Sequence, residues 1–435
     1  MTPRHSEIIE LIKKEVKPAL GCTEPIAVAL AVAKSIEILQ KNGFVTDRVH
    51  DDFKINVEVS PNIFKNAMGV GIPGTGMVGL HIAAALGAVC GKSSYGLEVL
   101  KDLNDTCITR SKEIVAAKAV EVGLTQTDKL LYIKASVSRD QHSAVTIIEN
   151  DHDNIAETSL DGTVLSSKTT VEALKEEKHT LDYKLSVQEI YSFAQEIEFE
   201  DIAFILESRT LNLALANEGL TGKYGLRVGW AIQKDANKEV FGVDFMSHAM
   251  CMTAAASDAR MAGCTLPAMS NSGSGNQGIT VTMPIIAYSQ LYKISEEQLA
   301  RALVLGHLIA IHIKGYLGKL SALCGCVIAS TGAACGLVYL RGGSYEQVCY
   351  SIKNMIGNIT GMVCDGAKEG CAMKVASGIA SAIQSAVLAR EDICISADDG
   401  IIEEDIEKTI KNLGTLGSKG MKYTDSMILE IMVCK

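Results

Sequence analysis

The spacing of apolar residues changes along this chain, and that change limits the folds open to it. Residues 53–59, 130–137 and 143–149 alternate between apolar and polar side chains, which is typical of strands with one buried face. From about residue 186 the spacing becomes mostly helical. The sequence therefore predicts an α+β fold in which the helical part is the larger.

Residues from about 48 to 180 hold the alternating segments and one expected helix, 109–122, so they form a small α+β unit. The charged, polar segment 172–184 is expected to be a linker to the helical region. At the other end, residues 5–17 have helical spacing, and Pro18 is expected to end that helix. A chain of 435 residues is long enough for two or three such domains.

Net charge and cysteine content indicate which partners and which cellular compartment suit this protein. The formal net charge is −10 and no basic block is present, which argues against nucleic acid and anionic membranes as partners. The 13 cysteines are an odd number, and the chain opens on the polar residues Met1-Thr-Pro-Arg-His without a signal-peptide pattern. We therefore expect a cytoplasmic protein with reduced thiols that are available for metal binding or catalysis.

One uncharged run, residues 320–340, has the length of a membrane span. It is rich in Gly, Ala, Ser and Cys rather than in Leu and Ile, and Lys314, Lys319 and Arg341 flank it. We interpret this run as a buried helix of a helical core, not as a transmembrane segment.

Two cysteines, Cys364 and Cys371, lie seven residues apart around Gly366 and Gly370. An unbroken helix would separate their Cα atoms by about 10.5 Å, but glycines with positive φ can fold the segment into a loop that aims both sulfurs at one point. Cys324 is the first candidate for a third ligand. The alternative is that these are buried, unreactive thiols, since cysteine is among the most buried residue types.

Cys22 lies in Gly21-Cys-Thr-Glu-Pro25, directly before an apolar helical run at 26–39. Thr23 is a plausible N-cap and Pro25 fits the first turn, so Cys22 is expected at a helix N-terminus. Backbone N–H groups and the helix dipole lower a thiol pKa at such a position, which makes Cys22 a candidate reactive thiolate. An ordinary buried cysteine is the alternative.

A glycine pattern precedes another expected helix. Gly74, Gly76 and Gly79 match GxGxxG, the fingerprint of dinucleotide-binding folds. That fingerprint needs a strand running directly into the first glycine, whereas Pro73 and further glycines fill the place here. Close packing, or backbone donors for a different ligand, explains these glycines better than NAD binding does.

A polar loop, residues 270–278, separates two apolar segments. Its N–H groups and hydroxyls can surround an anion, and its amide side chains can recognise a carboxylate or an amine. Arg260, at the end of the helix before it, could pair with a carboxylate or with an acidic neighbour. The candidate substrate-binding residues are Arg260, Ser272, Gly273, Ser274, Gly275, Asn276 and Gln277. The alternative is a flexible loop without a ligand. His307 and His312, on the apolar helix 300–316, are interpreted as core residues rather than ligands.

Five segments together resemble a known family. They are Gly21-Cys-Thr-Glu-Pro25, Pro73-Gly-Thr-Gly-Met-Val-Gly79, Ala256-Ser-Asp-Ala-Arg260, Pro267-Ala-Met-Ser-Asn-Ser-Gly-Ser-Gly-Asn-Gln-Gly-Ile279 and Cys364-Asp-Gly-Ala followed by Cys371-Ala-Met-Lys374. In these segments the chain resembles the L-cysteine desulfidase family, whose relatives are the iron–sulfur L-serine dehydratases through their alpha chain. The resemblance extends from about residue 8 to 433.

The resemblance implies a site and a reaction. Cys324, Cys364 and Cys371 would hold the [4Fe–4S] iron–sulfur cluster, and Cys22 would be a base near the substrate. The reaction implied is L-cysteine plus water to pyruvate, ammonia and hydrogen sulfide, without pyridoxal phosphate. The resemblance also implies that residues 1–46 and 185–435 form one helical domain, with an α+β domain of residues 47–184 inserted.

Alternatives to this function remain open. The same chemistry could act on L-serine or another β-substituted amino acid, or the chain could be a non-catalytic iron–sulfur or amino-acid sensor. A nicotinamide oxidoreductase is the least favoured alternative. Cys326 could replace Cys324 as a ligand, and Cys434 could reach the cluster from the C-terminus. A small amino acid is the expected ligand, and a homo-oligomer is the expected assembly.

Overall fold

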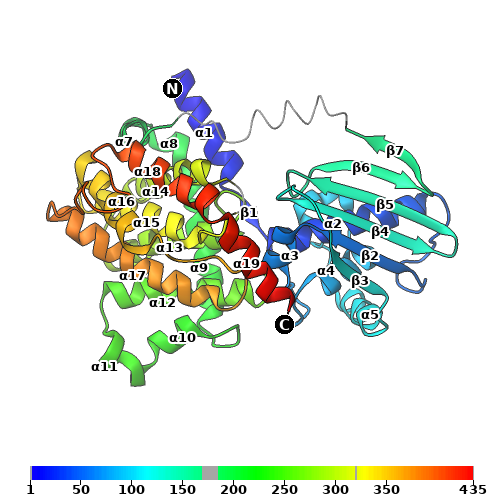
Figure 1. The fold of residues 1–435 in the computed structure, drawn as a ribbon. Coiled ribbons are helices and arrows are strands. Elements are labelled where there is room, and N and C mark those ends of the chain that lie inside the picture. Colours follow the sequence, from blue (N-terminus) through cyan, green and yellow to red (C-terminus); the bar gives the residue numbers. More distant parts are fainter. Residues whose placement is uncertain (1, 169–184, 319–320, 435) are drawn as a thin grey trace.

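The computed structural model describes residues 2–168, 185–318 and 321–434. Figure 1 shows two lobes, one made of packed helices and one built around a β-sheet, which confirms the predicted α+β fold class. The expected linker at 172–184 lies outside the described residues.

The sheet has six strands in the order β3-β2-β4-β5-β6-β7. The β2 and β3 strands pair in parallel and all other neighbours are antiparallel. The bounds are β2 Lys54–Val59, β3 Val120–Leu124, β4 Tyr132–Arg139, β5 His142–Glu149, β6 Ile155–Leu160 and β7 Thr163–Ser167. The central strands β2, β4 and β5 are the three that alternation predicted.

Two apolar helices cover one face of this sheet. The helix α2 (Thr23–Lys41) contacts β4, β5 and α4 (Leu80–Cys90), and its apolar residues share one core with the strands. This packing differs from the predicted assignment of residues 1–46 to the helical domain. The physical reason is that α2 is apolar around most of its circumference, so it needs the sheet on one side and α4 on the other. Two further helices complete the lobe, α3 (Pro61–Ala67) and α5 (Asp105–Ala116), with the 3₁₀ turn η1 (Ser93–Glu98) between α4 and α5.

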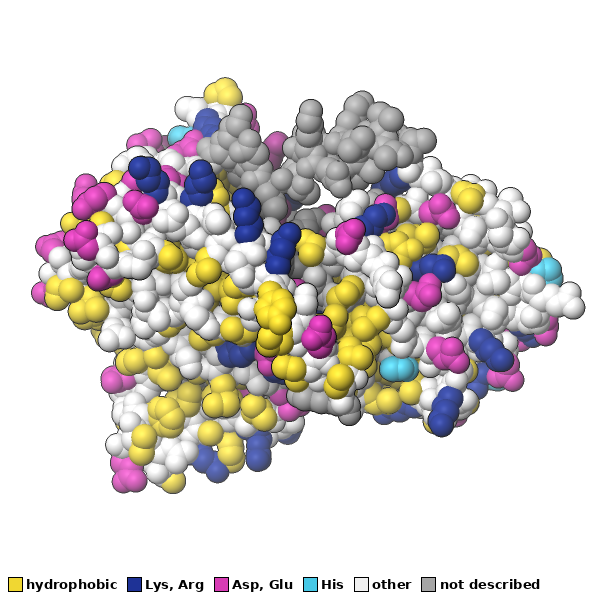
Figure 2. Space-filling view, in the orientation of Figure 1, with side chains coloured by type: hydrophobic (Ala, Val, Ile, Leu, Met, Phe, Trp, Pro, Cys, Tyr) yellow, Lys and Arg dark blue, Asp and Glu magenta, His cyan; other side chains and the backbone are white. Residues whose placement is uncertain are grey.

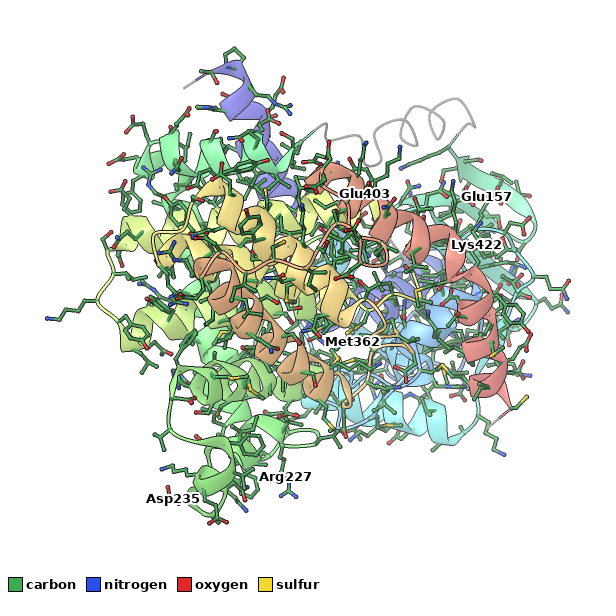
Figure 3. The ribbon with its side chains drawn as sticks, turned by 60° about the vertical axis from the view of Figure 1, so that its left-hand side comes forward. Glu157, Arg227, Asp235, Met362, Glu403 and Lys422 are labelled. Atoms are coloured by element: carbon green, nitrogen blue, oxygen red, sulfur yellow. The ribbon has the colours of Figure 1, made fainter. Side chains whose placement is uncertain are left out.

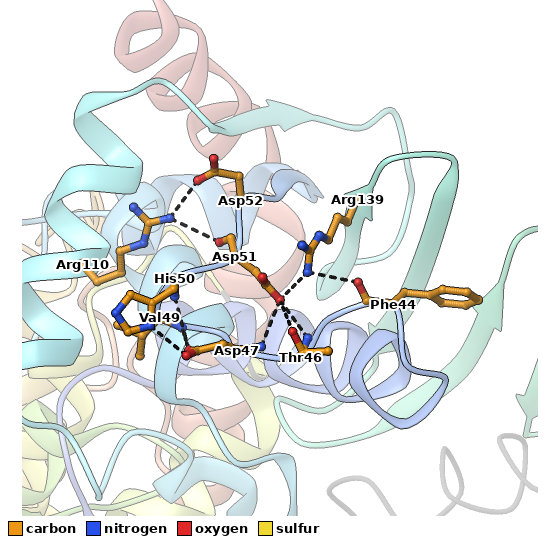
Figure 4. Close-up of polar contacts among 9 residues, drawn as sticks. All are labelled: Phe44, Thr46, Asp47, Val49, His50, Asp51, Asp52, Arg110 and Arg139. Atoms are coloured by element: carbon orange, nitrogen blue, oxygen red, sulfur yellow. Dashed lines mark hydrogen bonds and ion pairs between the residues drawn. The ribbon is translucent and has the colours of Figure 1, made fainter.

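The connection from α2 to β2 is fastened to the sheet by one carboxylate. Asp51 accepts hydrogen bonds from the backbone N–H groups of Thr46 (2.8 Å) and Asp47 (3.0 Å) and pairs with Arg139 of β4 (Figure 4). These backbone hydrogen bonds, together with Arg139, lower the pKa of Asp51 to about 2. The network ties the end of α2 to the sheet lobe.

The helical lobe has its own apolar core, formed mainly by α1, α7, α9 and α12 to α18. The bounds are α1 Pro3–Glu15, α7 Val187–Glu196, α8 Phe199–Ile202, η2 Ala203–Leu206, α9 Glu207–Gly219, α10 Val228–Gln233, η3 Asp235–Asn237, α11 Lys238–Phe241, α12 Phe245–Met261, α13 Gly275–Leu291, α14 Glu296–Leu317, α15 Gly325–Leu340, α16 Tyr345–Ile359, α17 Cys371–Arg390, α18 Ile406–Thr415, the π-helical turn η4 Leu416–Gly420 and α19 Lys422–Val433. A short antiparallel bridge, β1 (Pro18–Ala19) to β8 (Ala268–Met269), joins the end of α1 to the segment before α13.

Several predicted boundaries differ from the structure. The expected helix 109–122 ends at Ala116, because residues 120–124 pair with β2 as β3. The expected loop 270–278 is shorter, since α13 begins at Gly275. The helices α16 and α19 were not predicted.

Two of the helices resemble membrane spans by composition. The predicted buried helix at 320–340 is α15, which is buried along most of its length. The helix α17 is long and apolar enough to span a membrane, but half of its most apolar window is buried in the protein. Because α17 packs against α12, α15 and α16, we interpret it as a core helix.

The two lobes meet at the glycine-rich loop 69–79. The N–H of Gly71 donates to the carbonyl of Met261 (2.8 Å), and that of Gly74 donates to the carbonyl of Gly263 (3.1 Å). A Cβ on Gly71 would lie 2.4 Å from the carbonyl carbon of Ala262, so this close approach requires glycine. The helix α3, not a strand, precedes this loop. The glycines of the loop allow its backbone to pack closely against the end of α12.

Candidate functional site

A cavity of about 710 Å³ lies among segments of both lobes. All of the predicted site residues except Gly275 line it, namely Cys22, Arg260, Ser272, Gly273, Ser274, Asn276, Gln277, Cys324, Cys364 and Cys371. Their positions span about 350 residues of sequence, so the tertiary fold brings together the motifs that the sequence singled out.

Two backbone segments pair to bring Cys324 and Cys364 together. The N–H of Cys324 donates to the carbonyl of Met362 (3.0 Å), and the N–H of Cys364 donates to the carbonyl of Ala322 (2.7 Å). Met362, labelled in Figure 3, lies where the ribbons of the two lobes meet. This short bridge leaves the two thiols in hydrogen-bond contact.

The cysteine loop uses one of its two glycines as predicted. Gly366 has φ +94°, and a Cβ there would lie 2.1 Å from the carbonyl oxygen of Lys65 in α3. Only glycine fits that position. Gly370 differs from the prediction because its φ of −59° is helical, and it caps α17 directly before Cys371.

Positive charges surround the Cys364 thiol. Its pKa falls to about 6 because the Cys324 thiol donates to it and because Lys65 and Lys374 lie nearby, although burial opposes the shift. The pKa of Cys324 rises well above its usual value, as expected for the donor of such a pair. Burial raises the pKa of Cys371. Of these three thiols, Cys364 is therefore the one whose surroundings most favour the ionised form.

Cys324, Cys364 and Cys371 are the candidate ligands of an iron–sulfur cluster. The structure describes all 13 cysteines and none forms a disulfide, so Cys324, Cys364 and Cys371 are free thiols that line the same cavity. Lysine charge beside them suits thiolate ligands and an anionic centre. Among the described residues, no group of three His, Cys, Asp or Glu side chains is arranged to hold a metal ion. The donor types and their shared cavity fit the cluster, whereas the ligand geometry stays a prediction.

The two further cysteines considered as ligands differ in position. Cys326 lines the cavity, but its thiol donates to the carbonyl of Lys374 (3.2 Å), and burial raises its pKa to about 12. Cys434 is exposed at the end of α19 and is not among the residues that line the cavity.

Cys22 lies at the N-terminus of α2, as predicted, and is itself the N-cap residue, with Thr23 as the first helical residue. Of the two alternatives for Cys22, a reactive thiolate and an ordinary buried cysteine, the direction of its pKa favours the second. Burial raises the pKa of Cys22 to about 12, and the neighbouring Arg260 offsets only part of that effect. Loss of hydration is therefore the largest influence on the Cys22 thiol, and it favours the neutral form.

The Ser/Gly/Asn loop turns sharply before α13. Ser272 and Gly273 both have positive φ, +48° and +76°, and Ser274 caps α13 by accepting from the N–H of Gln277. The N–H of Ser272 donates to the carbonyl of Glu15 at the end of α1 (2.9 Å). The loop is thereby held in a fixed shape from both sides.

Arg260 lies behind this loop and is almost fully buried. It donates to the carbonyl of Gly21 (2.8 Å) and to the side-chain oxygen of Asn276 (3.3 Å). A Cβ on Gly275 would lie 2.2 Å from Nε of Arg260, so Gly275 contributes by letting the guanidinium approach the start of α13. The sequence predicts Gly275 as a substrate-binding residue, whereas in the structure it contacts Arg260.

Polar atoms without partners point to a ligand in this cavity. Nε of Arg260, Oε1 of Gln277 and Oγ1 of Thr280 are buried and have no hydrogen-bond partner among the described residues. All three residues line the cavity. Buried polar groups are rarely left unpaired in proteins, so these atoms are available to a polar ligand.

Sequence reasoning missed several lining residues. Lys314 of α14 lines the cavity, and burial lowers its pKa to about 8. Lys374, one turn after Cys371 on α17, is a second missed residue, and its helical spacing was the available signal. The turn 150–154 also reaches the cavity from the sheet lobe, which no local pattern indicated.

Comparisons with known proteins agree with the motifs. The serine dehydratase alpha chain family matches residues 94–430. A UPF0597 protein of Parabacteroides distasonis is 48% identical over 431 residues, covering 99% of this chain and 98% of that protein. A UPF0597 protein of Oleidesulfovibrio alaskensis is 47% identical over 435 residues, covering 100% and 99%. The chain therefore belongs to the serine dehydratase alpha chain family of iron–sulfur serine dehydratase-like lyases, as its motifs predicted.

Proposed function

We propose that this protein is a lyase that removes the β-substituent of a small L-amino acid, with L-cysteine as the preferred substrate. L-Cysteine and water would give pyruvate, ammonia and hydrogen sulfide. The observation that carries this proposal is that Cys324, Cys364 and Cys371 line the same cavity as Cys22 and the Ser272–Gln277 loop.

Cys324, Cys364 and Cys371 would hold the [4Fe–4S] iron–sulfur cluster, and no pyridoxal phosphate is proposed. With three thiolates, such a cluster keeps one iron open, which supplies a Lewis acid for the substrate carboxylate or the leaving sulfur. Lys65 and Lys374, which favour the Cys364 thiolate, would stabilise the ligand set in its deprotonated form.

The loop side of the cavity would hold the amino acid. The guanidinium of Arg260 and the N-terminus of α13 provide positive potential for a carboxylate. Oε1 of Gln277 is a buried acceptor without a donor among the described residues, which suits the substrate ammonium group. Fixed placement of both ends of the substrate would determine which atom the cluster faces.

Cys22 is proposed to take the α-proton. It lines the cavity next to the loop, and the hydroxyl of Thr23 donates to the carbonyl of Gly273 (3.3 Å). As a neutral thiol in the free protein, Cys22 must lose its own proton before it can accept one. Arg260 is the neighbouring charge that favours its thiolate.

L-Serine is the second candidate substrate, and the match to the serine dehydratase alpha chain family favours it. The two reactions differ only in the leaving group, hydrogen sulfide or water. A third possibility is a sensor that binds cluster and amino acid without turnover.

One experiment separates these functions. The protein is reconstituted anaerobically with iron and sulfide, and pyruvate is measured with L-cysteine and with L-serine. We expect turnover of both, with the higher kcat/KM for L-cysteine. A higher value for L-serine would reassign the substrate, and cluster binding without pyruvate from either would favour the sensor.

A cytoplasmic location and a homo-oligomeric state are also proposed, with neither nucleic acid nor membrane as a partner. Thirteen free thiols suit a reducing compartment. Along α19, Tyr423, Met427 and Ile431 lie on one helix face and are exposed, and Figure 2 shows apolar side chains over this region. Such a face could meet a second copy, which light scattering after size-exclusion chromatography would test.

A further inference from the structure

A hydrogen-bond chain runs from a buried histidine of the helical core to the cavity wall. His307 of α14 and Asn271 are fully buried, and Ser272 lines the cavity. Nδ2 of Asn271 lies 3.0 Å from Nδ1 of His307 and 3.2 Å from the backbone carbonyl oxygen of His307. The hydroxyl of Ser272 lies 2.9 Å from Oδ1 of Asn271.

The backbone carbonyl of His307 fixes the direction of every bond in this chain. A carbonyl oxygen can only accept, so the amide group of Asn271 that faces it must be the NH₂. The same NH₂ also faces Nδ1 of His307, which must therefore accept and carry no proton. The imidazole is neutral because burial lowers its pKa to about 3, so its single proton lies on Nε2.

The orientation of the Asn271 amide also fixes the direction of the hydrogen bond that Ser272 makes. With its NH₂ turned toward α14, Asn271 presents Oδ1 to the loop, and that oxygen can only accept. The hydroxyl of Ser272 therefore donates its proton to Oδ1 of Asn271 in a hydrogen bond. Only the lone pairs of Ser272 Oγ remain for a ligand, so this hydroxyl faces the cavity as an acceptor.

We propose that His307 is a positioning residue that, through Asn271, makes Ser272 an acceptor for the ammonium group of an amino-acid ligand. The inference rests on the proposed function, because it assumes that the cavity binds an amino acid. Oε1 of Gln277, a second acceptor on the same loop, supports it, since an ammonium has three donors to satisfy. Ser272 thereby becomes a specificity-determining residue that selects an α-ammonium group over an α-hydroxyl group.

The burial of His307 supports a role beyond packing. Its Nε2 has no hydrogen-bond partner among the described residues, so its ring makes its only described side-chain bond to Asn271. A leucine would fill the same space without leaving a polar atom unpaired. By contrast, His312, five residues on along α14, bonds Glu407 (2.7 Å) and not the loop.

The first test is binding of three probes to the reconstituted protein, measured by calorimetry. L-Alanine, L-lactate and propionate share a carboxylate and differ only in the α-substituent. We expect L-alanine to bind at least about tenfold more tightly than L-lactate, and Ser272→Ala to remove most of that preference with the affinity for propionate unchanged. An alanine preference that survives Ser272→Ala would overturn the inference.

The second test measures the tautomer of His307 in the wild-type protein, and a variant is needed only to assign the signal. Nitrogen-15 NMR of histidine-labelled protein distinguishes the two neutral tautomers, and the His307→Gln spectrum identifies the His307 signal. We expect the proton on Nε2, with no titration between about pH 5 and 8. A proton on Nδ1 would overturn the positioning role.

The third test compares KM and kcat of two histidine variants. His307→Gln should raise KM for the amino acid several-fold with a smaller change in kcat, while the matched control His312→Gln leaves KM unchanged. Equal effects of both variants on KM would mean a structural role only. The outcomes separate the two proposals. Turnover that does not depend on Ser272 overturns only this inference, whereas Ser272-dependent binding of L-alanine without turnover overturns only the lyase.

Discussion

Cys22 and Cys364 line the same cavity, yet their surroundings shift their thiol pKa values in opposite directions. Cys22 lies at the start of a long helix, where dipole and N–H groups are expected to favour a thiolate, yet burial raises its pKa to about 12. Cys364 lies in a loop without helix assistance, yet its pKa falls to about 6. The largest influence on the pKa of Cys22 is burial, whereas the largest influence on the pKa of Cys364 is the hydrogen bond from Cys324.

The difference comes from neighbours that are distant in sequence. Cys364 receives a hydrogen bond from Cys324 and the charge of Lys65 and Lys374, whereas Cys22 has Arg260 against a larger loss of hydration. Direct hydrogen bonds and full charges at short range exceed a helix dipole, which amounts to about half a charge. This difference suits a site in which Cys364 serves as a ligand thiolate and Cys22 as a proton-transferring thiol.

The largest expected effect is that of Cys364→Ala. Loss of the ionised thiol should abolish the visible absorbance of the reconstituted protein and lower pyruvate formation to background. Iron content and the absorbance spectrum are the measurements, and Cys394→Ala, at a cysteine that does not line the cavity, is the matched control. Unchanged iron content in Cys364→Ala would remove this residue from the ligand set.

Cys22→Ala should keep the absorbance but slow turnover by about 10²–10⁴-fold, the usual contribution of a general base. With a pKa near 12, the Cys22 thiolate fraction grows about tenfold per pH unit, so kcat/KM should rise from pH 7 to 9.5 without levelling off. The pH profile of the wild type measures this. A plateau near pH 8 would instead assign the proton transfer to Lys314, whose pKa is about 8.

Gly366→Ala should disturb the Cys364 wall more than any other glycine change in that loop. The added Cβ would meet the carbonyl of Lys65, and the positive φ disfavours alanine, so destabilisation above about 1 kcal/mol is expected. Thermal unfolding and iron content after reconstitution are the readouts. Gly370→Ala is the control, because Gly370 has a helical φ and an added Cβ would come no closer than 3.8 Å to the Lys368 side chain. Equal losses in both variants would contradict the proposed loop geometry.

The smallest effect is expected from Lys65→Met. This variant tests how much the Lys65 charge contributes to the low pKa of Cys364. In cluster-free protein, iodoacetamide should alkylate wild-type Cys364 with a midpoint near pH 6, since thiolate forms above that pH. Removing the Lys65 charge should move the midpoint upward and slow alkylation at pH 6 by up to about tenfold.

Asp425→Asn is the control for Lys65→Met, because it breaks the ion pair between α3 and α19 while leaving the lysine charge in place. Its alkylation midpoint should stay near that of the wild type. An upward shift in both variants would assign the effect to a displaced α19 rather than to charge, and peptide mass spectrometry would locate the alkylated residue.

Much of the fold followed from local patterns. Alternation located β2, β4 and β5, helical spacing located α12, α14 and α17, and the loop before α13 was recognisable from its Ser, Gly and Asn content. The packing of α2 against the sheet did not follow, because an apolar helix carries no label for the surface that will cover it. The turn 150–154 was not predicted as part of the site, because its local sequence does not indicate which distant segment it will approach.

The sequence by itself determined the family, the α+β class and the motif residues that line the cavity, because motifs, periodicity and glycine content are properties of short segments. Only the tertiary structure decided which thiol is ionised and which way the Ser272 hydroxyl points. Those outcomes depend on Lys65 beside Cys364 and on the His307 carbonyl beside Asn271. Ionisation and hydrogen-bond direction respond to charge, burial and bonding partners within a few ångströms, and here distant segments supply them.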